Sequence, residues 1–86
     1  MKLVFKYILT VGTLNTISAP EDAHILHFGN QHEIPCVWML VDDTKTYMNY
    51  SLRVVGTGEI LHENFLDHIG TASFSGGSEV YHCFLV

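Results

Sequence analysis

A glycine turn preceded by a lone arginine is the first place where residue types and spacing could do chemistry. Gly56-Thr57-Gly58 can present successive backbone N–H groups to an anion, with the Thr57 hydroxyl as a further donor. Arg53, three residues upstream, is the only arginine in the chain. A tight turn or bulge also explains two closely spaced glycines. The candidate ligand-binding residues for a phosphate or carboxylate group are therefore Arg53, Gly56, Thr57 and Gly58.

The histidines and cysteines suggest a metal site, but their spacing argues against one. Zinc needs three or four such side chains converging on one ion. His24 and His27 are three residues apart, so on a strand they face opposite sides. The sequence contains neither C-x2-C nor H-E-x-x-H. We therefore expect no metal and no cofactor.

Nucleophilic and acid–base chemistry are also poorly supported. His82 and Cys83 are adjacent, so on a strand they point to opposite faces, although Cys83 could meet His68 on a paired strand. The acidic pairs Glu21-Asp22 and Asp42-Asp43 lie in turn-like segments, where carboxylates usually bond the local backbone. We expect no catalytic residue and no enzymatic activity.

The elements that position these residues are predicted to be strands. In Lys2–Val11, every second residue from Leu3 is apolar, which is the period of a strand with one buried face. Similar runs separated by turn residues follow along the chain at residues 13–18, 23–29, 34–41, 47–55, 68–74 and 79–86. We predict a single all-β domain over residues 1–86, mainly antiparallel, forming a compact six- to seven-stranded β-sandwich or barrel.

Three local features refine this prediction. Ile34–Val41 is apolar on both faces, which predicts a central strand with Trp38 in the core. Gly76-Gly77 predicts a hairpin with a type I′ turn, because glycine accepts the positive φ that this turn requires. Leu61, Phe65 and Ile69 are four residues apart, so residues 59–67 could form at most one short helical turn.

Composition narrows the function classes. The net charge is −5 with only four basic residues, which argues against binding to a DNA or RNA backbone. No apolar run approaches the ~20 residues of a membrane span, and Lys6 interrupts the only stretch that resembles a signal peptide. Cys36 and Cys83 lie in apolar runs and are expected to be free thiols. We expect a cytoplasmic protein that does not associate with membranes and that forms homo-oligomers, because self-association would help so small a core.

Several short motifs together resemble a family of small uncharacterised proteins from phages and bacterial prophages. They are Lys6-Tyr7-x-Leu9, Ala23-x-Ile25-Leu26, Pro35-Cys36-x-Trp38-x-Leu40-Val41-Asp42, Arg53-x-x-Gly56-Thr57-Gly58, Ile69-Gly70-Thr71 and Gly76-Gly77…Val80-x-His82-x-Phe84. The resemblance spans nearly the whole chain of 86 residues. It implies a small soluble protein that works in the cytoplasm of an infected bacterium, and it carries no activity or catalytic residue.

These observations leave several functions open. The leading hypothesis is a non-enzymatic phage accessory protein that binds a host protein and counters host defence by occupying it. It would use an apolar surface, or the acidic one formed by Glu21, Asp22, Asp42 and Asp43. The alternative is a sponge for a small signalling nucleotide at an oligomer interface, with Arg53 and the glycine turn as its site. A small metal-dependent hydrolase and a structural or assembly protein are the remaining possibilities.

Overall fold

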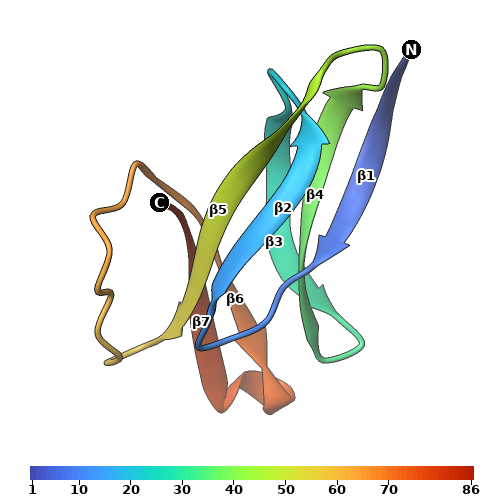
Figure 1. The fold of residues 1–86 in the computed structure, drawn as a ribbon. Coiled ribbons are helices and arrows are strands. Elements are labelled where there is room, and N and C mark those ends of the chain that lie inside the picture. The colour runs from blue at the N-terminus through green and yellow to red at the C-terminus, as the bar shows by residue number, and fades with distance from the viewer.

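The alternation of apolar and polar residues forms seven strands in the computed structural model, which describes residues 1–86 (Figure 1). Every predicted strand is present, and the observed bounds differ from the predicted ones by at most three residues. A short 3-10 turn, η1 (Ser75–Gly77), is the only helical element. The strands are β1 (Lys2–Ile8), β2 (Leu14–Pro20), β3 (His24–Gln31), β4 (Ile34–Asp42), β5 (Tyr47–Gly56), β6 (Asp67–Phe74) and β7 (Glu79–Leu85).

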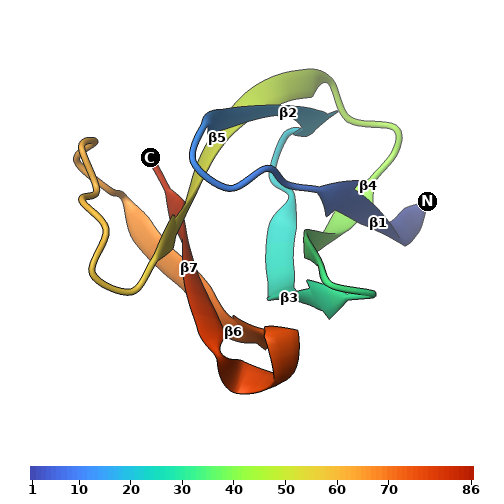
Figure 2. The same ribbon diagram turned by 90° about the horizontal axis from the view of Figure 1, so that it is seen from below.

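The strands form two antiparallel sheets, which confirms the all-β prediction. One sheet has the order β1-β4-β3 and the other the order β2-β5-β7-β6. The sheets meet where β3 runs beside β6, while the opposite edges, β1 and β2, pair with no further strand (Figure 2). The sandwich is therefore closed on one side and open on the other. The fold contains no helix of the length and apolar character needed to cross a bilayer.

The core lies between the two sheets and consists entirely of apolar side chains. No polar or charged residue is fully buried. The chain is small, so this apolar burial is its main source of stability. The tightest cluster contains Leu9, Ile17, Ala19, Phe28, Val37, Met39, Val41, Leu52, Val54 and Cys83.

Strand β4 is central, as predicted, but Trp38 is not part of the core. Val37, Met39 and Val41 point inward, so Trp38 projects from the outer face and is half-buried. The ring of His27 covers part of it, with ring centroids 5.6 Å apart. The prediction that both faces of this strand are buried was therefore only partly right.

The predicted turn in the last hairpin is present, but the predicted helical turn is not. Gly76 and Gly77 both have positive φ, and Ser78 N donates to Ser75 O, as a type I′ turn requires. Residues 59–66 are irregular. The C-terminal end of this segment is held by a tertiary bond instead, since Leu66 N donates to Leu85 O at 2.7 Å.

Candidate functional site

Arg53 projects from β5 and is already paired with a carboxylate. Its Nε lies 3.0 and 3.1 Å from the two Glu63 oxygens, and one Nη also contacts Glu63. This pairing lowers the pKa of Glu63, chiefly through the hydrogen bond from Arg53. The guanidinium charge is therefore largely neutralised within the chain.

The glycine turn at the end of β5 uses two of its N–H groups internally. Thr57 N donates to Val80 O at 3.1 Å, and Glu59 N donates to Gly56 O at 3.0 Å. A Cβ at Gly56 would lie 2.5 Å from Glu59 Oε1, and Gly58 has a φ of +89°. The positive φ of Gly58 thus favours glycine in this turn, whereas a Cβ at Gly56 would meet only the end of the Glu59 side chain. A carboxylate rather than an open anion nest therefore lies beside the turn.

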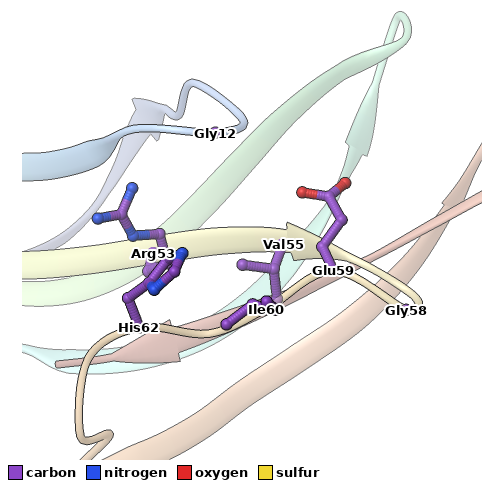
Figure 3. A pocket seen from close by; sticks show the side chains of 7 residues that line it. All are labelled: Gly12, Arg53, Val55, Gly58, Glu59, Ile60 and His62. Atoms are coloured by element: carbon purple, nitrogen blue, oxygen red, sulfur yellow. The ribbon is translucent and has the colours of Figure 1, made fainter.

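The four predicted residues line two separate hollows on either side of this turn. Arg53 and Gly58 line an open hollow of about 430 Å³ with Gly12, Val55, Glu59, Ile60 and His62 (Figure 3). Gly56 and Thr57 line a second one of about 350 Å³ with Glu59, Ser78, Glu79, Val80 and Tyr81. Figure 3 shows the Arg53 guanidinium and the Glu59 carboxylate on the same side of β5. Both hollows therefore combine an acidic group with apolar and glycine surface.

A series of polar contacts that was not predicted from the sequence links the turn after β5 to β7 and β6. Thr57 Oγ1 lies 2.7 Å from His82 Nε2, and His82 Nδ1 lies 3.0 Å from Thr71 Oγ1. Thr71 Oγ1 in turn lies 3.1 Å from His68 Nε2. The contact between Thr71 and His82 could have been predicted from the sequence, because a hairpin turn at Gly76-Gly77 places these two residues opposite each other.

These contacts between Thr57, His82, Thr71 and His68 are best described as a cross-strand hydrogen-bond network. Both nitrogens of His82 contact threonine hydroxyls, and no carboxylate orients the ring as in a hydrolytic triad. Cys83 lies in the core, whereas His68 is exposed on the outer face, so the two do not form a pair. Burial raises the pKa of the Cys83 thiol to about 12, which makes it a poor nucleophile. The structure brings together no group of three or more potential metal ligands.

The irregular segment Glu59–Leu66 exposes three large apolar side chains, of which Ile60 lines the first hollow. Ile60 is 72% exposed, Phe65 55% and Leu66 76%. Phe65 also packs edge-on against Phe84 of β7, with centroids 5.1 Å apart. This contact, the Arg53–Glu63 pair and the Leu66–Leu85 bond hold the segment against the sheet.

The four acidic residues predicted as a binding surface come together at one end of the sandwich. The two turns that contain them are joined by Glu21 N, which donates to Thr46 O at 2.8 Å. Asp22 pairs with Lys45 at 3.5 Å, and Asp42 and Asp43 both contact the Met1 amino group. Two positive groups, the Met1 amino group and Lys45, therefore offset about half of the negative charge on these four residues.

Comparison with known proteins gives one match. A family model described as a domain of unknown function (DUF7352) matches residues 1–86. No curated protein and no solved structure matches the chain.

Proposed function

The chain belongs to the DUF7352 family, a domain of unknown function, and we propose that it is a non-enzymatic binding protein that acts by occupying a host protein. The observation that carries this proposal is the segment Glu59–Leu66. Three large apolar side chains are more than half exposed there, on an irregular segment held by the Arg53–Glu63 pair and by the Leu66–Leu85 bond. Exposed apolar groups on an anchored loop are typical of protein-binding surfaces.

The charges around this segment indicate the chemistry of the partner. Arg53 is neutralised by Glu63, whereas Glu59, Asp67 and Glu79 form no ion pair. The surroundings of the segment are therefore apolar with an acidic rim. A partner surface with apolar residues bordered by lysine or arginine is complementary to it.

The resemblance to phage and prophage proteins supplies the setting. In this proposal the protein is phage-encoded, acts in the host cytoplasm and counters a defence protein by blocking its surface. The absence of a carboxylate-oriented triad, and the burial of Cys83, favour occupancy over catalysis.

Quantitative affinity capture from infected host cells tests the proposal. The wild-type chain is compared with a variant carrying Ile60→Ser and Leu66→Ser, two exposed positions whose substitution should leave the core unchanged. Met48→Ser, at a similarly exposed position on β5, is the matched control. We expect a partner that binds stoichiometrically to wild type and control and is lost from the loop variant. Equal capture by all three proteins, or no stoichiometric partner, would contradict the proposal.

A nucleotide sponge is the second candidate, because Arg53 and Gly58 line the same hollow. The carboxylates of Glu59 and Glu63 oppose anion binding there. A thermal-shift panel of cyclic di- and trinucleotides tests it, since a ligand at 100 times its Kd stabilises the fold by ~2.7 kcal/mol. A shift that disappears with Arg53→Ala would favour this function, and no shift with any nucleotide would exclude those tested.

A further inference from the structure

Strand β1 forms an open edge of the sandwich. It pairs only with β4, and Figure 1 shows it as the outermost strand on its side of the molecule. An unpaired strand edge is a template for another strand. The side chains of β1 alternate between exposed and half-buried along its whole length.

The hydrogen bonds at the two ends of β1 show which backbone groups face outward. Leu9 N donates to Pro35 O at 2.9 Å, and Asp43 N donates to Met1 O at 3.1 Å. In an antiparallel pair, residues bonded to the neighbouring strand alternate with residues whose N–H and C=O point the other way. The odd-numbered residues therefore bond to β4. The outward backbone groups belong to Lys2, Val4, Lys6 and Ile8.

Lysines on an edge strand usually discourage pairing, but Lys6 of β1 is turned toward its own sheet. Lys6 Nζ donates to Gln31 Oε1 of β3 at 2.6 Å, so its ammonium group reaches across β4 and away from the edge. Lys2 lies opposite Asp42 in the β1–β4 register, beside a charge of opposite sign.

The other open edge, β2, is less suited to pairing. Glu21 N donates to Thr46 O, so by the same alternation the outward backbone groups belong to Leu14, Thr16, Ser18 and Pro20. Proline has no N–H to donate, and it is typical of strand edges that stay unpaired.

We propose that β1 pairs antiparallel with β1 of a second copy of this chain, with the two-fold axis passing through Phe5. Three registers near the middle of the strand pair the outward backbone groups, with the axis through Val4, Phe5 or Lys6. The positions of the lysines favour the axis through Phe5. An axis through Val4 places Lys2 opposite Lys6, and an axis through Lys6 places the two Lys6 residues opposite each other. An axis through Phe5 places Lys6 opposite Val4 and Lys2 opposite Ile8, so no lysine faces a lysine.

This register also covers apolar surface on the inner face. Leu3, Phe5 and Tyr7 are half-buried at the margin of the core, on the open side of the sandwich. Pairing places Phe5 against Phe5 and Leu3 against Tyr7, at positions without backbone bonds, where side chains approach most closely. The result is a continuous six-stranded sheet in the order β3-β4-β1-β1-β4-β3.

The dimer is independent of the segment Glu59–Leu66, so its test is separate from that of the proposed function. Sedimentation equilibrium and native mass spectrometry of the untagged full chain measure the dimer dissociation constant. Val4→Lys places a lysine opposite Lys6 twice in each dimer, and we expect the constant to rise roughly tenfold. The same change makes the net charge of each chain less negative, which weakens the general repulsion between copies. That effect alone would lower the dissociation constant, so a rise reports the contact between the lysines.

Two further variants make the register testable. Adding Lys6→Glu to Val4→Lys places the introduced lysine opposite the introduced glutamate, so we expect the wild-type constant to return. Thr16→Lys, the same charge change on the β2 edge, should leave the constant unchanged. Circular dichroism checks that each variant is folded.

Amide hydrogen exchange by NMR locates the contact. We expect the amides of Val4 and Lys6 to become protected as the dimer fraction rises, whereas those of Leu3 and Phe5 are protected in both states. A monomer at every concentration up to about 1 mM would overturn the proposal. A dimer that Val4→Lys does not weaken, or exchange at Val4 that does not depend on concentration, would also overturn it.

Discussion

Gly70 of β6 lies so close to Phe28 of β3 that a methyl group at Gly70 would be 3.2 Å from Phe28 Cβ. The two strands belong to different sheets, and this contact lies on the closed side of the sandwich. A register shift between His68 and Gly70 accompanies the approach. Asn30 Nδ2 of β3 also donates to Ser73 O of β6 at 3.0 Å, so side-chain and packing contacts replace a backbone ladder here.

Gly70→Ala should therefore destabilise the fold. The added methyl forces Phe28, which is fully buried, to shift within a packed core. We expect a loss of about 1–3 kcal/mol in the free energy of unfolding, measured by urea denaturation. Asp67→Ala, at an exposed position of the same strand, is the control. If Gly70→Ala and wild type had the same free energy of unfolding, the prediction would be wrong, and the two sheets could separate slightly without loss of stability.

Tyr50 joins the start of β3 to the end of β2. Its hydroxyl donates to Pro20 O at 2.7 Å and accepts from Ala23 N at 3.3 Å. Tyr50→Phe leaves both groups without this partner, and we expect a loss of about 1–3 kcal/mol in thermal or urea unfolding. Tyr47→Phe removes an exposed hydroxyl from the same strand and should change little. A similar effect of both variants would contradict this role.

Asp42 makes stability depend on pH in the acidic range. Bonds from the Thr44 hydroxyl and backbone N–H lower its pKa from 3.8 to about 2. Because the pKa of Asp42 is lower in the folded state, the ionised carboxylate stabilises the fold fully above pH 3.8. This stabilisation is lost as the pH falls through about 2.

Thr44→Val removes the hydroxyl but keeps the N–H. We expect the Asp42 pKa to rise toward 3.8, followed by NMR titration of its carboxyl carbon. The acid unfolding midpoint should move to higher pH. Thr46→Ala, in the same turn, is the control, and an unshifted Asp42 titration in Thr44→Val would contradict the assignment.

Glu63→Gln should loosen the segment Glu59–Leu66. The variant replaces the ion pair with Arg53 by a neutral hydrogen bond at most, so the segment is then held mainly by its contacts with β7. We expect faster limited proteolysis between residues 59 and 66 in the variant. Glu59→Gln, which removes a carboxylate that forms no ion pair, should not have this effect.

The pH dependence of the wild type gives a second measurement. The pKa of Glu63 is lowered from 4.5, so its pairing is complete above that value and is lost as the pH falls through the depressed pKa. Cleavage of the wild-type segment should therefore accelerate under acidic conditions. Equal cleavage of Glu63→Gln and wild type at neutral pH would show that the ion pair does not anchor the segment.

The strands and the hairpin turn were predictable because they depend on local patterns. Alternation around Phe5 and the double glycine at Gly76 fix the strand period and the turn without reference to the rest of the chain. Trp38 was placed in the core wrongly, because the sequence of β4 does not show which of its two apolar faces the second sheet covers.

The candidate site was less predictable because its contacts are tertiary. The spacing of Leu61 and Phe65 suggested a helical turn, but Phe65 packs on Phe84 instead. The partner of Arg53 lies ten residues away on an irregular segment, where no periodicity applies. Arg53, which the sequence suggested as a residue for binding an anionic ligand, is therefore already half of an ion pair within the chain.

The two ends of the chain lie beside the two surfaces discussed above. Met1 immediately precedes the open edge strand, and Val86 follows the β7 residue that binds Leu66. A fluorophore attached at residue 1 should therefore report self-pairing, and one attached at residue 86 should report occupation of the apolar segment. Affinity tags carry the corresponding risk, because each placement would obstruct one surface and leave the other free.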